Sequence, residues 1–276
     1  MPELPEVETV VRTLEKQIAN DVITALEIRY PKVIATDPDQ FQEILGKQIL
    51  AYKRRGKYLQ FMLSDDYILY VHLRMEGKFY IYENSEDTYS KHIHLVMKLQ
   101  SGKYLCYHDT RKFGRFYLVK QGTSLQEIDK LGYEPFQEEL TPKILYTMCH
   151  NSKEDLKTFL LNQEHICGIG NIYANEVCYH MQLHPRYKVN KLTQKECHDL
   201  LHYIRIILNE AIQHGGTTIR SYTSSLGVTG LFQLQVKVHG KENEECVACG
   251  TLIKKIMLHQ RGTYYCPNCQ RRGSRS

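Results

Sequence analysis

The residues with the clearest chemical potential stand at the start of the chain, which opens with the letters MPELPEVE. Removal of the initiator Met would leave Pro2 with a free secondary amine beside the Glu3 carboxylate. An α-amino group has a reference pKa of about 8, so part of this amine is unprotonated at neutral pH. Attack on a sugar or carbonyl carbon would then give an iminium adduct. The same residues are also typical of a plain helix entry, where an early Pro and acids in the first turn are favoured. From this stretch alone both interpretations stay open.

Four of the nine cysteines form a second group with evident chemistry. Cys246 and Cys249, followed by Cys266 and Cys269, make two C-x-x-C pairs separated by sixteen residues. This spacing is typical of a zinc site. Four thiolates leave no coordination position for a catalytic water, so we expect one structural Zn²⁺ that folds a small hairpin. The other five cysteines are scattered singly, which indicates a reduced compartment and not a disulfide framework.

Basic residues gather at turns and at the zinc hairpin. Three basic turns lie between expected strands, at residues 53–57, 72–78 and 109–115. The hairpin region carries Lys254, Lys255, Arg261, Arg271, Arg272 and Arg275. A net charge of +5 is a weak argument for a nucleic-acid partner, but the clustering is typical of a phosphate-binding surface. An ordinary solvated surface is the alternative.

These residues need elements that position them, and the first 120 residues predict a helix followed by strands. Apolar residues recur at helical spacing from Pro5 to about Ala19. Runs rich in β-branched and aromatic residues follow, and they are typical of an all-β sandwich or barrel. We expect strands at 22–28, 48–52, 58–63, 68–73, 78–82, 92–99, 104–107 and 116–119.

The second half of the chain reads as helical, with a domain boundary near residues 131–135. Thr141-Pro142 begins one helix, and capping-box patterns at 152–155 and 193–196 precede two more. Glycines at 168 and 170 open another helix, either as a phosphate-binding loop or as a tight turn between helices. A strand-like segment at 231–239 leads into the zinc hairpin.

Length and composition limit the class of protein. A chain of 276 residues with 42% hydrophobic content can hold two domains and an appendage. No window approaches eighteen consecutive apolar residues, and acids occupy the place where a signal peptide has a basic region. We therefore expect a soluble, intracellular protein with no membrane partner.

Together these motifs resemble those of the bacterial formamidopyrimidine-DNA glycosylases (8-oxoguanine DNA glycosylases), from Met1 to about Gln270. The matching stretches are residues 2–9, 55–59, 72–77, 91–94, 109–114, 168–176, 215–218, and the zinc hairpin with 260–263. The resemblance implies an α+β multidomain fold: an N-terminal helix plus β-sandwich (1–133), a helix-two-turn-helix DNA-binding domain (134–230) and a C-terminal zinc finger (231–276). Double-stranded DNA containing oxidised bases or abasic sites would bind in the cleft between them.

The resemblance also assigns chemistry to individual residues. The mature Pro2 would attack C1′ of the damaged nucleotide, expel the base and form a Schiff base, and β- and δ-elimination would then cut the strand. Glu3 would donate or relay a proton to the opening sugar. Lys57 would assist proton transfer in strand cleavage, and Arg261 would serve the last elimination.

Base extrusion gives three otherwise unexplained residues a role. An enzyme that excises a base must take it out of the stack and fill the gap. Met75, Arg111 and Phe113 match the family's filling residues: a flexible apolar side chain, a donor for the orphaned base and an aromatic wedge. Taken singly, Met75 or Phe113 would more often be a residue of the sandwich core; their place within the two turn motifs favours the wedge.

Other positions match the DNA-contacting surface of the family. The resemblance places ten residues there: Glu6, His72, Met75, His92, Arg111, Phe113, Lys153, Lys157, Asn171 and Tyr173. Ser152 stands where relatives usually carry Lys or Arg, so Lys153 is expected to substitute and Ser152 to be a helix N-cap. Thr110 replaces a commoner Pro. Lesion preference is expected to be set in the loop from residue 221 to residue 230.

The resemblance predicts a bifunctional glycosylase and abasic-site lyase that removes oxidised purines (8-oxoguanine, formamidopyrimidines) in base excision repair. We expect a cytoplasmic monomer that acts at the nucleoid. One alternative is an endonuclease-VIII-like glycosylase for oxidised pyrimidines, which usually lacks this filling set. A second is a non-catalytic lesion-binding homologue, which intact Pro2, Glu3 and Lys57 disfavour. A third, a zinc-ribbon factor, leaves the first 130 residues unexplained.

Overall fold

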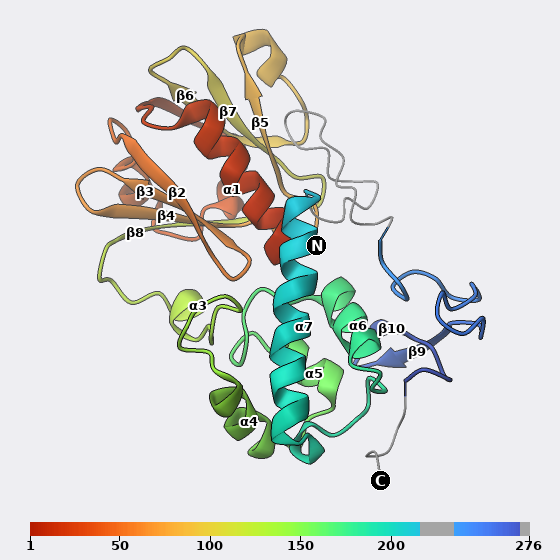
Figure 1. The fold of residues 1–276 in the computed structure, drawn as a ribbon. Coiled ribbons are helices and arrows are strands. Elements are labelled where there is room, and N and C mark those ends of the chain that lie inside the picture. The colour runs from red at the N-terminus through yellow and green to blue at the C-terminus, as the bar shows by residue number, and fades with distance from the viewer. Residues whose placement is uncertain (216–234, 271–276) are drawn as a thin grey trace. The chain divides into compact units, whose positions relative to one another are not determined.

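The computed structural model describes residues 1–215 and 235–270, and these form two compact units (Figure 1). The first contains Met1–Asp129, and the second contains Lys130–Gln213 together with residues 235–270. The helical segment and the zinc hairpin thus belong to one compact unit. The domain limits at 133 and 230 stay a prediction.

Helix α1 (Leu4–Ile18) opens the first unit, within one residue of the expected bounds at each end. Pro5 lies in its first turn, where the missing N–H costs no hydrogen bond. One face, which includes Leu4, Val7 and Leu14, is buried. The helix contacts β2 and β3, so the start of the chain is fixed to the sheet that carries the Lys57 turn.

Eight strands form two four-stranded antiparallel sheets, as the sandwich prediction requires. One sheet has the order β1-β6-β7-β5 and the other β2-β3-β4-β8. The strands are β1 (Ile23–Ile28), β2 (Ile49–Arg55), β3 (Tyr58–Leu63), β4 (Tyr67–His72), β5 (Lys78–Tyr82), β6 (Ile93–Leu99), β7 (Tyr104–His108) and β8 (Arg115–Lys120). Short helices lie between or after them: η1 (Pro31–Val33), α2 (Pro38–Gln42), η2 (Ser85–Thr88) and α3 (Gln126–Asp129). Both sheets and α1 share one core, in which the rings of Phe61, Phe79, Tyr107 and Phe116 meet.

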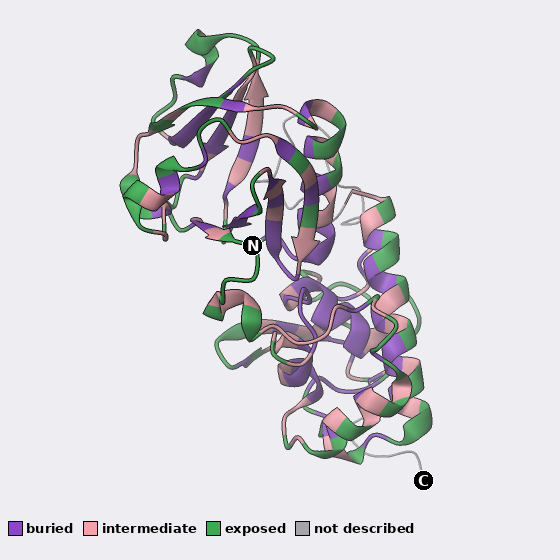
Figure 2. Ribbon diagram, turned by 90° about the vertical axis from the view of Figure 1, so that its left-hand side faces the viewer, coloured by how far each residue is buried: buried purple, intermediate pink, exposed green. Residues whose placement is uncertain are grey.

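The second unit is helical. Its helices are α4 (Pro142–His150), α5 (Leu156–Leu161), α6 (Asn171–His180), η3 (Val189–Lys191) and α7 (Gln194–Gln213). The long α7 buries one face, with residues such as Leu200, Ile204, Ile207 and Ala211 at spacings of three and four (Figure 2). None of the helices in the described part of the chain has both the length and the apolar run that a bilayer crossing requires.

Two of the three predicted helix caps are confirmed. Thr141 Oγ1 accepts the N–H of Ile144, and Thr193 and Glu196 bond reciprocally, each side chain to the other's backbone N–H. The prediction for Ser152 is wrong, because α5 begins only at Leu156 with Asp155 at its N-cap. Ser152 Oγ instead bonds to Glu154, ahead of the helix.

The C-terminal hairpin consists of β9 (Lys254–Leu258) and β10 (Arg261–Tyr265). Its two-residue turn places His259 and Gln260 at φ of +45° and +60°, the geometry of a tight hairpin turn. The strand expected at 231–239 is wrong over 235–239, where no strand forms. Residues 231–234 lie outside the described part.

Candidate active site and nucleic-acid interface

The N-terminal pair is held by the first turn of α1. The backbone N–H of Glu3 donates to Glu6 Oε2 at 2.8 Å, and the Glu3 carbonyl accepts the N–H of Val7 at 3.1 Å. Pro2 and Glu3 are both buried. Glu6, expected at the DNA surface, therefore has a positioning contact with the residue that follows Pro2. The carboxylate also complements the positive end of the helix dipole.

Lys57 lies on the two-residue turn between β2 and β3. Gly56 adopts a φ of +56°, which a residue without Cβ allows at little cost. Arg54 donates to the Gly56 carbonyl at 3.0 Å and to Glu8 Oε2 at 3.1 Å. Since Glu8 belongs to α1, this ion pair ties the Lys57 turn to the helix that holds Pro2. The Lys57 side chain is buried, so its ammonium is placed in a partly desolvated site.

His72 is a neutral hydrogen-bond donor at the end of β4. Its Nδ1 accepts the backbone N–H of Arg74 at 2.9 Å, so the ring proton resides on Nε2. Burial, with the nearby charges of Arg74 and Lys57, lowers the pKa of His72 to about 3. The ring therefore stays uncharged through the physiological range and cannot act as a cationic phosphate contact there.

The three wedge residues (Met75, Arg111 and Phe113) lie on exposed turns, not in the sandwich core. Met75 is 41% exposed and Phe113 is 47% exposed. The Arg111 guanidinium lies 4.8 Å from the centre of the Phe113 ring. The alternative that Met75 and Phe113 are core residues is therefore wrong. Exposed large apolar side chains beside an arginine are what insertion into a base stack requires.

His92 lies just before β6, half-buried, with its ring 5.4 Å from that of His108. Burial lowers the pKa of His108, and the neighbouring His92 and Lys78 act in the same direction. The His92 carbonyl accepts the backbone N–H of Asp109 at 2.9 Å. His92 is thus in the first unit, next to the turn that carries Arg111 and Phe113.

In the second unit, two predicted DNA contacts converge on the hairpin turn and the start of β10 (residues 259–263), called here the turn that carries Arg261. Lys157 Nζ donates to the Gly262 carbonyl at 3.1 Å and to Thr263 Oγ1 at 2.7 Å. Asn171 Nδ2 donates to the same carbonyl at 3.1 Å. Arg261 itself is exposed. The neighbouring carbonyl is therefore fixed by two side chains while the guanidinium remains available.

Two of the predicted DNA-contacting residues are buried in the second unit. Lys157 and Tyr173 have no exposed surface at all. Lys157 bonds to the hairpin. Tyr173 belongs to α6, most of whose residues are buried. Direct DNA contact by these two residues stays a prediction. Lys153, by contrast, is exposed.

The four hairpin cysteines converge as a zinc site requires. Their Sγ atoms all lie within 4.8 Å of one another. The Cys246–Cys269 and Cys249–Cys266 pairs are separated by 3.8 and 3.5 Å. Zn–S bonds of about 2.3 Å in a tetrahedron give sulfur separations of about 3.8 Å, so the residues fit Zn²⁺. Tyr179 Oη lies 3.5 Å from Cys246 Sγ, an outer contact of the kind that orients a metal ligand.

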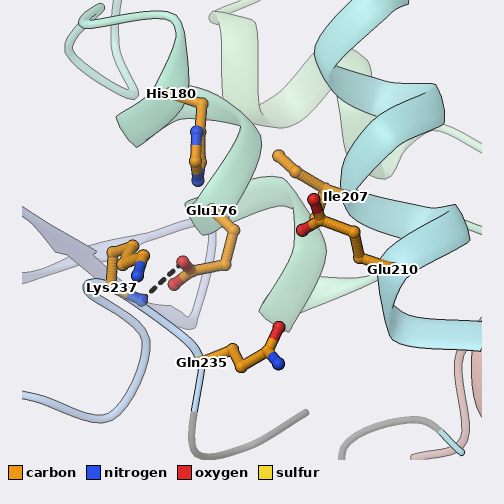
Figure 3. A pocket seen from close by; sticks show the side chains of 6 residues that line it. All are labelled: Glu176, His180, Ile207, Glu210, Gln235 and Lys237. Carbon is orange, nitrogen blue, oxygen red and sulfur yellow. Dashed lines mark hydrogen bonds between the residues drawn. The ribbon is translucent and has the colours of Figure 1, made fainter. Parts of the chain in front are cut away.

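Sequence reasoning missed the role of Glu176. Its buried carboxylate accepts the backbone N–H groups of Lys237, Val238 and His239 at 2.7, 3.1 and 2.9 Å. Figure 3 shows the first of these bonds. These bonds replace the expected strand with a segment wrapped around one carboxylate. Burial raises the pKa of Glu176, although the three donors favour its charged form. A small cavity of about 110 Å³ lies beside it, lined by Glu176, His180, Ile207, Glu210, Gln235 and Lys237.

The predicted site residues divide between the two units. Pro2, Glu3, Lys57, His72 and the wedge residues belong to the first unit. The zinc cysteines, Arg261, Lys157 and Asn171 belong to the second. Their assembly around one nucleotide stays a prediction.

Exposed basic turns, a helical unit and a four-cysteine hairpin define a class: multidomain zinc-finger proteins with surfaces suited to nucleic acid. Three family models match the chain. They are the formamidopyrimidine-DNA glycosylase N-terminal domain over residues 1–116, the H2TH domain of the same enzymes over 131–223, and the zinc finger found in FPG and IleRS over 243–272. The chain belongs to the formamidopyrimidine-DNA glycosylase family, as its motifs predicted.

Individual relatives span nearly the whole chain. The formamidopyrimidine-DNA glycosylase of Streptococcus pneumoniae is 44% identical over 99% of this chain and 100% of its own length. That of Bacillus subtilis is 42% identical over 98% and 99%. A Lactococcus lactis FPG mutant in complex with a Fapy-dG containing DNA has a TM-score of 0.92 at 41% identity, covering 98% of this chain and 99% of that one. The Lactococcus lactis Fpg bound to an abasic site containing DNA has a TM-score of 0.91 at 41% identity, covering 97% and 99%.

Proposed function

We propose that this protein is a bifunctional DNA glycosylase and abasic-site lyase of base excision repair, acting on oxidised purines in duplex DNA. The observation that carries the proposal is the fixed N-terminus. Pro2 precedes a helix whose first turn holds Glu3 through Glu6, and an ion pair from the same helix ties down the Lys57 turn. Family membership adds that the relatives are named for this activity and that solved relatives hold damaged DNA.

The first chemical step is base release. After Met removal, the lone pair of the Pro2 nitrogen attacks C1′, and the bond from C1′ to the base breaks with its electron pair leaving on the base. The N–H proton of the attacking Pro2 nitrogen passes to the departing base. Glu3 then supplies a proton to the sugar ring oxygen as the ring opens, which lets the nitrogen form an iminium with C1′. The cationic Schiff base then acidifies the C2′ proton.

Strand cleavage follows from that acidity. Loss of the C2′ proton expels the 3′ phosphate in β-elimination, and loss of the C4′ proton expels the 5′ phosphate in δ-elimination. Lys57 has the buried ammonium for proton transfer in the first cleavage. Arg261, whose guanidinium stays charged, suits the second phosphate. Hydrolysis of the iminium releases Pro2.

Base extrusion rests on the exposed wedge. Met75 and Phe113 are apolar and exposed, so they would replace the stacking surface of the extruded nucleotide. Arg111 would offer its donors to the orphaned partner base. His72 provides an uncharged Nε2–H donor at the base of the Met75 turn.

The second unit would hold the DNA backbone. Lys153 and Arg261 are exposed cations, and the Asn171 amide keeps a second N–H for a phosphate besides the one it gives Gly262. Bound Zn²⁺ supplies folding energy to the hairpin and no reacting group. We place the enzyme in the cytoplasm as a monomer that acts at the nucleoid.

Borohydride trapping on duplex DNA with a single 8-oxoguanine tests the proposal, followed by mass mapping of the adduct. We expect one crosslink at a mature Pro2. Pro2→Gly should weaken excision and keep DNA affinity, because the change removes the secondary amine and no phosphate contact.

Each contrary outcome selects an alternative. A crosslink with an oxidised-pyrimidine duplex but none with 8-oxoguanine would support the endonuclease-VIII-like reading. DNA binding with no crosslink on either lesion, or on an abasic site, would leave a non-catalytic lesion-binding homologue. Full excision activity in Pro2→Gly would reject Pro2 as the nucleophile.

A further inference from the structure

A buried pair of residues in the first unit joins the two turns that carry the wedge residues. These are the Met75 turn (residues 73–77) and the Phe113 turn (residues 109–114). Tyr107 and Asp109 both have no exposed surface. Tyr107 Oη donates to Asp109 Oδ2 at 3.0 Å. Neither residue carries a role in the chemistry proposed above.

Asp109 fixes the backbone of the Phe113 turn. Its Oδ1 accepts the N–H of Arg111 at 2.9 Å. Its Oδ2 accepts the N–H groups of Phe113 at 2.9 Å and Gly114 at 3.0 Å. One carboxylate thus sets the backbone of two wedge residues. Buried charge-assisted bonds of this kind are the stronger class of hydrogen bond.

Tyr107 lies directly against both turns. A Cβ built on Gly77 would come within 2.4 Å of Tyr107 Oη, and one built on Gly114 within 1.7 Å. Glycine at both positions therefore lets the phenol approach the two turns at once. The Tyr107 ring is held in turn by Phe79 and Phe116, at centroid separations of 5.6 and 4.9 Å.

A second link joins the same turns at the surface. Thr110 Oγ1 donates to the Glu76 carboxylate, across from the Phe113 turn to the Met75 turn. Glu76 follows Met75, and Thr110 precedes Arg111. The commoner Pro at position 110 has no hydroxyl for this bond. Since the pair is exposed, we expect it to contribute less than the buried link.

We propose that Tyr107 and Asp109 are positioning residues for base extrusion. They hold the Met75 and Phe113 turns in one fixed arrangement, so that the three wedge residues enter the DNA stack together. The proposal rests on the proposed function, since it needs a base to be extruded. Its consequence is selective: losing the pair impairs steps that need extrusion and spares the chemistry at Pro2.

Two substrates separate these steps. Excision from a duplex with 8-oxoguanine opposite cytosine requires extrusion and gap filling, whereas cleavage of a single-stranded oligonucleotide with a preformed abasic site requires neither. We expect Tyr107→Phe to slow single-turnover excision from the duplex about tenfold, as loss of a bond to a carboxylate implies. The rate at which Tyr107→Phe cleaves the abasic strand should stay within about twofold of the rate of the unaltered protein. A tenfold change corresponds to about 1.4 kcal/mol.

Tyr104→Phe is the matched control. Tyr104 is the first residue of β7 and pairs with Tyr82. Tyr107 lies towards the other end of the same strand and pairs with Phe79. It should leave both reactions unchanged. Asp109→Asn should exceed the loss in Tyr107→Phe on the duplex, since an amide places N–H donors against backbone N–H donors. Equal losses of Tyr107→Phe on both substrates, or no loss on the duplex, would overturn the proposal.

A background without the apolar wedge gives a second check. The double variant Met75→Ala/Phe113→Ala has no apolar wedge side chains for Tyr107 to position. In this background the effect of Tyr107→Phe on duplex excision should shrink to about twofold or less. A full tenfold effect there would show that Tyr107 acts by another route. Inactivity of the unaltered protein on both substrates would instead reject the proposed function, before any variant is compared.

Discussion

The turn that carries Arg261 depends on a buried hydroxyl, and Thr263→Val removes that hydroxyl with little change in side-chain shape. Thr263 Oγ1 accepts from Lys157 Nζ at 2.7 Å and donates to the Arg261 carbonyl at 3.1 Å, with no exposed surface. A hydrogen bond to a charged group contributes about 1.5–3 kcal/mol and a neutral one about 0.5–1.5 kcal/mol. We expect Thr263→Val to lower the free energy of unfolding of the zinc-loaded protein by about 2–4.5 kcal/mol.

Thr158→Val is the matched control for that measurement. Thr158 follows Lys157 in α5, and its buried Oγ1 has no hydrogen-bond partner among the described residues. Replacing an unpaired buried hydroxyl by a methyl group removes a desolvation cost and no bond, so this variant should be neutral or slightly more stable. The chain has no Trp, so denaturant unfolding is best followed by helix circular dichroism. Equal midpoints for the two variants would refute the assignment.

The same substitution should also change the reaction products. If Lys157, through Thr263, positions the Arg261 turn, Thr263→Val should enrich the β-elimination product over the β,δ-product on an abasic duplex. The ratio is read on a denaturing gel, because the two 3′ ends migrate differently. An unchanged ratio at a temperature where the variant is folded would show that Arg261 does not depend on this contact.

Two further predictions concern protonation and zinc. The ring signals of His72 should not titrate between about pH 5 and 8 in NMR spectra. The pKa of His72 is about 3 in the folded protein, whereas an unfolded His has a pKa of about 6.5. The free energy of unfolding should therefore fall as the pH drops from about 6.5 towards 3, by up to about 1.4 kcal/mol per pH unit. His72→Gln should flatten that slope. Cys249→Ser or chelation should abolish DNA affinity by unfolding the hairpin, and unchanged affinity in zinc-free protein would contradict a binding role for it.

Regular elements of the first unit were predictable because local sequence determines them. The strand limits at 58–63 and 78–82 match the structure at both ends. The faces were less readable: β4 is buried along its whole length, so its sequence does not alternate. The sequence of such a strand predicts that a strand forms, but not which side chains face the core.

The capping patterns show how far local signals extend. Thr193 and Glu196 complete a reciprocal box, and the helix begins at the next residue. The pattern at Ser152 is equally good in sequence, yet the chain there pairs Asp155 with Lys188 in a β-bridge and starts its helix at Leu156. A tertiary contact therefore decided where α5 begins.

Polar residues that bond across long sequence separations were the least predictable. Lys157 and the Gly262 carbonyl are 105 residues apart, and Glu176 and the Lys237 N–H are 61 apart. A lysine or a glutamate is usually exposed, so composition argues against burial. What reverses that expectation is a set of partners supplied by another part of the chain, which no local pattern contains.

Helix α6 makes three side-chain contacts within the second unit from one of its faces. Asn171, Asn175 and Tyr179 follow a spacing of four, so they share one face of the helix. That face bonds to the Gly262 carbonyl, to His239 Nδ1 and to a zinc-ligand sulfur. The phosphate interpretation uses N–H groups at the helix start, whereas these contacts use side chains along its length, so the two do not compete. One rigid helix thus contacts both the Arg261 turn and the metal site, and loss of zinc should displace Arg261 even though no zinc ligand belongs to the proposed chemistry.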